Sequence, residues 1–321
     1  MPRVKLGLVL PTWDWSSSPR HSNIEGGEPV DYRVVKALAL AAEQLGYHSV
    51  FSNDHIVRGE GGYILEGWTV LAALSAITKK ITLGNLVLCN AFRTPQLLAK
   101  RAATLDVMCG GRFELGIGAG WLEDEYVRYG MPFPKPASRI AQLREGLDVI
   151  TRLWTRDRVT FQGKYYTLKE AICEPKPIQK PHPPIMVGGG GEQRTLRVVA
   201  EFGDLCNFGG SPTTYEHKLG VLRTHCEAVG RRFNEIERSW TGDMVIAANK
   251  IDLRKKIQQI KPKDMPVEDY VEANIVGTPE ACVKKVEAYT KLGVTYFTIS
   301  GFSKIRENDM DLIAKRVMPS L

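Results

Sequence analysis

The feature that most constrains the fold of this chain is a regular alternation of short apolar runs with segments of helical periodicity. Apolar residues recur at helical spacing in the longer segments, whereas the runs between them are short and rich in β-branched residues. Eight such runs lie in residues 4–11, 48–54, 81–89, 112–120, 183–191, 204–210, 238–248 and 295–301. Eight strands separated by helices favour a (β/α)8 barrel, the TIM-barrel fold of the α/β class, over a doubly wound sheet.

The first helical segment, residues 31–46, carries signals for both of its ends. Asp31 is suited to cap the amino terminus, because its carboxylate can accept hydrogen bonds from the first backbone N–H groups. Gly46 is suited to end the helix, since glycine adopts the left-handed conformation that closes many helices. The apolar residues predicted to face the core are Val34, Leu38, Ala41 and Leu45.

Two segments interrupt the alternation. Residues 121–182 hold a helical stretch, a hairpin-like sequence "RVTFQGKYYTL" and a proline-rich stretch, and residues 249–277 are rich in charge. No low-complexity linker divides the chain. We therefore expect one TIM-barrel domain over residues 1–321, with insertions after strands 4 and 7.

Basic residues outnumber acidic ones but are spread along the chain. The net charge is +7, and the densest basic stretch, residues 253–263, places Ile257 and Ile260 at helical spacing. This stretch is better explained as a solvated helix than as a nucleic-acid-binding patch. We therefore expect no nucleic-acid partner, and a mildly basic surface suits an anionic small ligand.

The cysteines and the hydropathy pattern predict the cellular compartment of the protein. Six cysteines are scattered through apolar runs without a C-x-x-C pair, which is typical of buried free thiols in a reducing environment. No apolar stretch reaches the length of a transmembrane helix, and the amino terminus enters a strand rather than resembling a signal peptide. These features predict a cytoplasmic protein with no membrane partner.

Polar and aromatic residues follow several predicted strands, at the barrel end where active sites of this fold lie. The second strand ends in Asp54 and His55. Because the strand is anchored in the barrel wall and an imidazole exchanges protons near neutral pH, His55 is the main candidate for acid–base catalysis. Asp54 is a candidate to orient His55 or to contact a ligand, although adjacent strand residues face opposite ways. Candidate substrate contacts are Trp13, Trp15, His21 and Trp121, and for the first three a packing or surface role is the alternative.

The remaining titratable residues predict neither a metal site nor a hydrolase triad. The six histidines show no H-x-H or H-E-x-x-H spacing, so we expect no resident metal. The chain also lacks a G-x-S-x-G motif, which leaves a serine hydrolase without support.

Two glycine-rich runs follow predicted strands. The run "GIGAGW" (116–121) fails the G-x-G-x-x-G dinucleotide pattern, because Trp121 stands where the last glycine is needed. Its glycines allow either close approach of a planar ligand or tight packing of the strand. The run "GGGGEQRT" (188–195) joins a strand to a helix, where backbone N–H groups and the helix dipole can bind a phosphate. An ordinary flexible loop is the alternative for this second run.

Together these residues resemble a known family. The chain is similar over nearly its whole length to the bacterial-luciferase-like flavin and deazaflavin oxidoreductases, and most similar to their coenzyme F420-dependent branch. The segments that carry the resemblance are "SNDHI", "LGNLV", "RTPQLLAKRAATLDVMCGGRFELGIGAGWLEDEYVRYGMPF", "LWTRDRVTFQGKYYTL" and "EPKPIQKPHPPIMVGGGGEQRTLRVVAEFGD".

The resemblance implies a TIM barrel that holds an isoalloxazine-like ring at the carboxyl ends of its strands, and it implies a homodimer. It also implies that Asp54 and His55 lie near the ring and that a non-prolyl cis peptide at Leu86–Val87 supports the ring's back face. The positions that would line the ring and its tail are Gly118, Gly120 and Asp124, and those that would receive the phosphate are Gly188, Gly189, Gly190 and Gly191.

The leading hypothesis is an enzyme that transfers a hydride between the C5 carbon of coenzyme F420 and a small organic substrate. Two alternatives stay open: a two-component monooxygenase that uses reduced FMN from a separate reductase, and a non-catalytic flavin- or deazaflavin-binding protein. Sugar-phosphate dehydrogenases of the F420 branch carry a glutamate where this chain has Trp121. The resemblance therefore assigns no particular substrate.

Overall fold

Eight parallel strands close into a barrel in the computed structural model, which describes residues 4–13, 30–58, 62–300 and 307–321. The barrel closes because β1 pairs with β12 and β10 pairs with both β12 and β9. The predicted (β/α)8 barrel is therefore confirmed. Its strands in chain order are β1 (Lys5–Val9), β2 (Ser49–Ser52), β3 (Thr82–Asn85), β5 (Phe113–Gly118), β8 (Ile185–Gly188), β9 (Leu205–Phe208), β10 (Glu237–Ile246) and β12 (Tyr296–Ser300).

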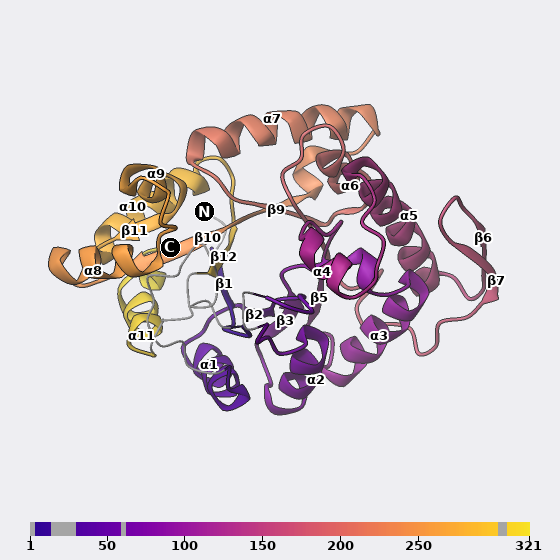
Figure 1. The fold of residues 1–321 in the computed structure, drawn as a ribbon, viewed down its shortest axis with the longest axis horizontal. Helices are drawn as coiled ribbons and strands as arrows, with labels where there is room; N and C mark the ends of the chain where they lie inside the picture. Colours follow the sequence, from indigo (N-terminus) through magenta and orange to yellow (C-terminus); the bar gives the residue numbers. More distant parts are fainter. Residues whose placement is uncertain (1–3, 14–29, 59–61, 301–306) are drawn as a thin grey trace.

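Helices surround this barrel, as Figure 1 shows. Each is amphipathic or apolar on the side that meets the strands, which is why the alternation along the sequence becomes two concentric layers. The outer helices are α1 (Tyr32–Gln44), α2 (Gly67–Ile77), α3 (Pro95–Met108), α5 (Pro136–Thr155), α6 (Thr195–Phe202), α7 (Pro212–Ala228), α10 (Pro279–Thr290) and α11 (Glu307–Arg316). Short 3-10 turns are η3 (Asn90–Phe92), η4 (Phe233–Glu235) and η6 (Met318–Ser320).

Helix α1 has the predicted ends, and its buried face agrees with the prediction only in part. The Asp31 side chain accepts the N–H of Arg33, and Gly46 follows the helix with a φ of 81°. Val34 was expected in the core but is 49% exposed. Leu38 is buried as predicted, and Ala41 and Leu45 are partly buried against the core. Packing turns the helix so that Val35, rather than Val34, faces the barrel. The buried residues of α1 are Val35, Leu38, Ala39 and Ala42.

Two sets of additional elements follow the fourth and seventh barrel strands, β5 and β10. The first contains α4 (Glu123–Arg128) and an antiparallel hairpin of β6 (Val159–Gln162) and β7 (Thr167–Ala171), as the sequence predicted. The second contains α8 (Lys250–Ile260), α9 (Val267–Ala273) and β11 (Ile275–Gly277), which pairs in parallel with β10. Both insertions therefore follow the strands predicted from the sequence.

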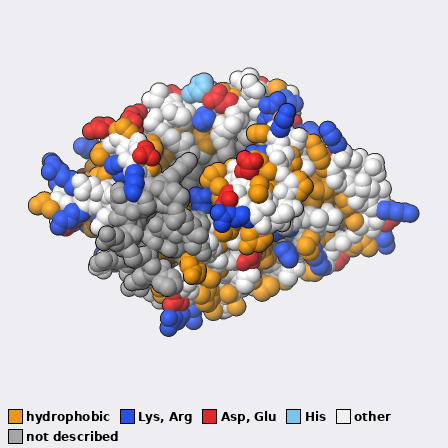
Figure 2. All heavy atoms as spheres, viewed as in Figure 1, with side chains coloured by type: hydrophobic (Ala, Val, Ile, Leu, Met, Phe, Trp, Pro, Cys, Tyr) orange, Lys and Arg blue, Asp and Glu red, His pale blue; other side chains and the backbone are white. Residues whose placement is uncertain are grey.

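The basic stretch at residues 253–263 falls largely within α8, as expected for a solvated helix. Ile257 is 7% exposed and packs in a small cluster with Val245 and Tyr270. On the face of the molecule in Figure 2, basic and acidic side chains of the described residues are interspersed. Among those residues, no helix is both long and apolar enough to cross a membrane.

The interior of the barrel encloses a carboxyl group. Glu114 on β5 is 4% exposed, and its Oε2 lies 3.5 Å from the hydroxyl of Tyr296, which donates to Ser49 Oγ at 2.6 Å. Its Oε1 has no hydrogen-bond partner in the described part of the chain. Burial raises the pKa of Glu114 to about 8, and the charge of Glu237 acts in the same direction while Lys5 opposes it. Glu114 is therefore mostly protonated at neutral pH.

Replacing Glu114 with glutamine is expected to stabilise the protein at neutral and alkaline pH. Below the ordinary value of 4.5 the carboxyl is protonated in both states, but between 4.5 and about 8 only the unfolded chain loses the proton. The free energy of unfolding therefore falls over that window in the wild type, and a neutral glutamine removes this loss. Urea unfolding at about pH 5 and at about pH 8 measures how far the free energy of unfolding falls between the two. This fall should be larger in the wild type than in Glu114→Gln by about 3 kcal/mol. Equal losses in both proteins would contradict a protonated Glu114.

Candidate active site

Three strands meet around Val87 at the carboxyl end of the barrel. The Leu86–Val87 peptide is cis, at the position implied by the family resemblance, and β4 (Leu88–Cys89) continues from it along β5. A Cβ atom on Gly118 would lie 2.9 Å from a Val87 methyl carbon, and one on Gly188 would lie 2.8 Å from the other methyl. Tight packing, one of the two explanations left open for the first glycine run, therefore accounts for Gly118.

Gly120 is required by the turn that follows β5. Its φ is 76°, and a Cβ atom there would lie 2.1 Å from the hydroxyl of Tyr126 and 2.6 Å from the sulfur of Cys89. These two atoms are themselves 3.1 Å apart. The turn at Gly120 is therefore fixed by packing against α4 and β4.

Asp54 lies at the end of β2 in a buried ion pair. The guanidinium of Arg93 donates two hydrogen bonds of 2.8 Å to its carboxylate, and the N–H of Cys89 donates a third of 2.7 Å. The Asp54 side chain is 3% exposed and that of Arg93 is 8% exposed. Asp54 therefore ties the segment after β3 to β2, and the partner of its carboxylate is Arg93 rather than His55.

His55 has a different carboxylate partner. Its Nδ1 lies 2.8 Å from Oε2 of Glu125, a residue of α4 whose side chain is 2% exposed. The other oxygen of Glu125 accepts the N–H of Ile56 at 2.7 Å and that of Val57 at 3.2 Å. One buried carboxylate thus holds both the imidazole and the backbone that follows it.

The two neighbouring acids of α4 face different surroundings. The side chain of Asp124, which the family resemblance implies beside the cofactor, is 56% exposed and pairs with Arg128 at 2.8 Å. Adjacent helical residues point about 100° apart, so the exposure of Asp124 accompanies the burial of Glu125. The structure therefore brings Glu125, and not Asp124, to His55. The sequence signal for Glu125 was only its place in an acidic run, "EDE".

Two tryptophans and an arginine lie beside His55. The guanidinium carbon of Arg58 is 4.8 Å from the ring centroid of Trp13 and 5.1 Å from that of Trp121. Trp121 is 58% exposed and its ring meets that of His55 edge-on at 6.2 Å, whereas Trp13 is only 4% exposed. Trp121 therefore offers surface to a ligand and Trp13 mainly packs. The other two candidate substrate contacts, Trp15 and His21, lie outside the described residues.

The glycine loop between β8 and α6 has backbone N–H groups that are available to a ligand. The N–H of Gly189 donates to the carbonyl of Asn207 at 2.9 Å, and its φ is 116°. The N–H groups of Gly190 and Gly191 have no hydrogen-bond acceptor within the described ranges. The ammonium of Lys218 donates to the carbonyl of Gly190 at 2.6 Å. The ammonium also lies 3.5 Å from Oε1 of Glu192. Two available N–H groups near a helix start, with Lys218 beside them, make this loop suited to an anion.

The other features of the described chain add no competing site. All six cysteines are buried free thiols, as predicted. In the described ranges no group of three His, Cys, Asp or Glu residues could hold a metal ion.

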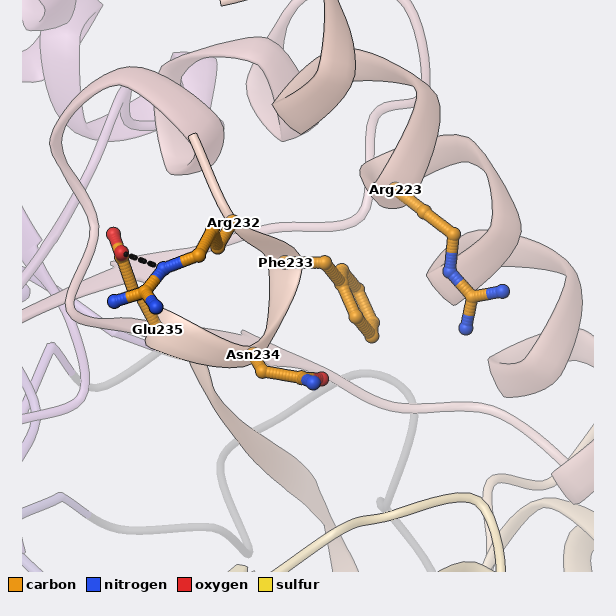
Figure 3. A pocket seen from close by; sticks show the side chains of 5 residues that line it. All are labelled: Arg223, Arg232, Phe233, Asn234 and Glu235. Carbon is orange, nitrogen blue, oxygen red and sulfur yellow. Dashed lines mark hydrogen bonds and ion pairs between the residues drawn. The ribbon is translucent and has the colours of Figure 1, made fainter. Parts of the chain in front are cut away.

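A hollow of about 530 Å³ lies beside η4, before β10, and thus at the amino ends of the strands. As Figure 3 shows, it is lined by Arg223, Arg232, Phe233, Asn234 and Glu235.

Known proteins are similar to this chain in sequence and in fold. An F420-dependent glucose-6-phosphate dehydrogenase from Nakamurella multipartita is 29% identical, over 88% of this chain and 91% of the relative. An F420-dependent secondary alcohol dehydrogenase, solved with an F420–acetone adduct, has a TM-score of 0.81 at 20% identity and covers 99% of both chains. A long-chain alkane monooxygenase has a TM-score of 0.82 at 13% identity, covering 100% of this chain and 91% of its own.

The likeness to these two solved structures shows the fold alone, because their sequence identities are low. Membership of a family follows from the sequence itself. The sequence model of the luciferase-like monooxygenases matches residues 12–296, which include six of the eight barrel strands, from β2 to β10. The chain therefore belongs to the luciferase-like monooxygenase family.

Proposed function

We propose that this protein is an F420-dependent oxidoreductase that transfers a hydride between the C5 carbon of the deazaflavin and a small organic substrate. The observation that carries the proposal is a histidine, held by a buried carboxylate, at the same barrel end as a glycine loop with available N–H groups. The relative that is 29% identical and the alcohol dehydrogenase of the same fold are both F420-dependent, which supports the choice of cofactor.

The glycine loop fits the phosphate of such a cofactor. Phosphate oxygens accept hydrogen bonds from backbone N–H groups at the start of a helix, and a nearby ammonium adds favourable charge. In our proposal the N–H groups of Gly190 and Gly191 bind the phosphate and Lys218 lies beside it. Gly188 and Gly189 give the loop its shape, since Gly188 packs against Val87 and Gly189 has a positive φ.

The remaining candidate residues take roles that match their surroundings. The bound deazaflavin would supply the carbon that accepts or donates the hydride. His55 exchanges a proton with the substrate, and Asp54 acts indirectly, by holding the segment after β3 through Arg93. The Leu86–Val87 segment supports the ring, and Trp121 contacts the substrate beside His55. Asp124 faces solvent, and in our proposal it contacts the outer part of the cofactor tail.

The enzyme assignment is tested by turnover with a panel of substrates. The protein is incubated with F420 and alcohols or sugar phosphates, and with reduced F420 and enones or imines, while the absorbance of the deazaflavin is followed. The proposal predicts turnover with at least one class. A protein that binds F420 and turns over none of them would favour the non-catalytic binding protein.

Gly190→Val is expected to weaken cofactor binding without unfolding the barrel. A Cβ atom at Gly190 meets only the flexible end of Lys218, at 3.3 Å, so the fold can accept the change. A branched side chain would crowd the phosphate and cost at least one charge-assisted hydrogen bond, so affinity should fall about tenfold or more. Cofactor titration measures this, and Gly220→Val, at an open position on α7, is the control. Unchanged affinity in a folded Gly190→Val protein would place the phosphate elsewhere.

We also infer a homodimer and a cytoplasmic location. The dimer rests on the family resemblance, and the location on the buried free thiols, which suit a reducing compartment. Sedimentation at micromolar concentration is expected to show a dimer, and a monomer would contradict this part of the proposal.

A further inference from the structure

We propose that Glu125 is a positioning residue that fixes the tautomer of His55, with the proton on Nδ1, and thereby reserves Nε2 for proton exchange with the substrate. The inference rests on the proposed function for the use of Nε2. The tautomer itself does not depend on that function, and it can be measured in the protein without any cofactor.

The geometry around Glu125 assigns the proton. Oε1 already accepts two N–H groups, from Ile56 and Val57, and Oε2 lies 2.8 Å from Nδ1 of His55. An ionised carboxylate can only accept hydrogen bonds, so Nδ1 must donate. A neutral imidazole carries one N–H, and with that proton on Nδ1 its Nε2 is an acceptor.

Nothing in the described part of the chain uses Nε2. The contacts of His55 there are the Nδ1 bond to Glu125 and the edge-on ring of Trp121. In the oxidation of an alcohol, a bound deazaflavin would take up the hydride from the carbon, and Nε2 would accept the proton of the hydroxyl, leaving a carbonyl. The reverse reaction returns both. An imidazole with its proton on Nε2 could not accept that proton.

Glu125 also fixes where the imidazole lies. Its Oε1 holds the backbone just after His55, while α4 itself belongs to the first insertion. The carboxylate therefore has two separable tasks, anchoring the backbone through Oε1 and setting the tautomer through Oε2. A substitution that keeps one task and reverses the other can separate them.

Glu125→Gln is that substitution. Its amide oxygen can still accept from Ile56 and Val57, while its NH2 group faces Nδ1 as a donor and drives the proton to Nε2. The protein is labelled with 15N-histidine and examined by NMR without cofactor, at about pH 9, where an ordinary imidazole is neutral. His55 is assigned from the signals that disappear in His55→Ala. Glu123→Gln, an exposed position on the same helix, is the matched control.

We expect Nδ1–H in the wild type and in Glu123→Gln, Nε2–H in Glu125→Gln, and a kcat at least about tenfold lower in Glu125→Gln with KM little changed. An Nε2–H tautomer in the wild type, or an unchanged tautomer in Glu125→Gln, would overturn the inference. If Glu125→Gln does not fold, the wild-type spectrum alone decides. If the tautomers are as expected but F420 is neither bound nor turned over, the proposed function fails and the tautomer assignment stands.

Discussion

His55→Ala is expected to fold, to bind cofactor almost as tightly as the wild type, and to lower turnover at least ~10²-fold. Hydride transfer to or from a substrate such as an alcohol also requires a proton to move, and an acid–base group in the right place contributes ~10²–10⁴-fold to the rate. His55 lies at the end of a barrel strand and is held by the buried Glu125. Removing the imidazole leaves the barrel strands untouched, so the loss should appear in kcat.

Stopped-flow measurement of deazaflavin reduction at saturating cofactor checks this prediction. His182→Ala is the control, because His182 precedes β8 at the opposite end of the barrel, where its Nδ1 lies 2.9 Å from the carbonyl of Pro183. A folded, cofactor-saturated His55→Ala protein with near-normal turnover would show that His55 does no chemistry.

Asp54→Asn is expected to destabilise the protein by about 3–5 kcal/mol. The substitution keeps the shape of the side chain but leaves the guanidinium of Arg93, which is 8% exposed, with only the half-exposed carboxylate of Glu66, 3.5 Å away. A buried charge that loses its partner retains the full cost of its removal from water, whereas removal of both charges together is far less harmful. Urea unfolding at neutral pH measures the change in the free energy of unfolding.

Two further variants make the test specific. Asp124→Asn removes an aspartate–arginine pair whose side chains are more than half exposed, and it should cost no more than about 1 kcal/mol. The double variant Asp54→Asn with Arg93→Met should recover part of the stability lost in Asp54→Asn. If Asp54→Asn is no less stable than Asp124→Asn, the buried ion pair does not hold the site together.

The barrel could be predicted from the sequence because its signals are local. Eight apolar runs, helical periodicity and turn glycines each lie within a few residues, and the same holds for the hairpin in the first insertion. The buried face of α1 could not be predicted as well. Val34 and Val35 both belong to apolar stripes of helical spacing, and only packing against the barrel selects Val35.

The candidate site was predictable in position but not in its pairing. Parallel strands end on one side of a barrel, so Asp54, His55 and the glycine loop could be placed together from sequence. The partners of Asp54 and His55 lie 39 and 70 residues away along the chain, and no local pattern connects them. The buried position of Glu125 also depends on α4, a six-residue helix too short to show periodicity in the sequence.

The measurement that tests the central claim most directly is a side-by-side titration of the protein with F420 and with FMN, each followed by fluorescence. Both cofactors can use the glycine loop for a phosphate, so the comparison isolates preference for the deazaflavin and its longer anionic tail. The account predicts clearly tighter binding of F420, and weaker binding of F420 in Gly190→Val but not in Gly220→Val. Equal or tighter binding of FMN by the wild type would contradict it and would favour an FMN-dependent monooxygenase.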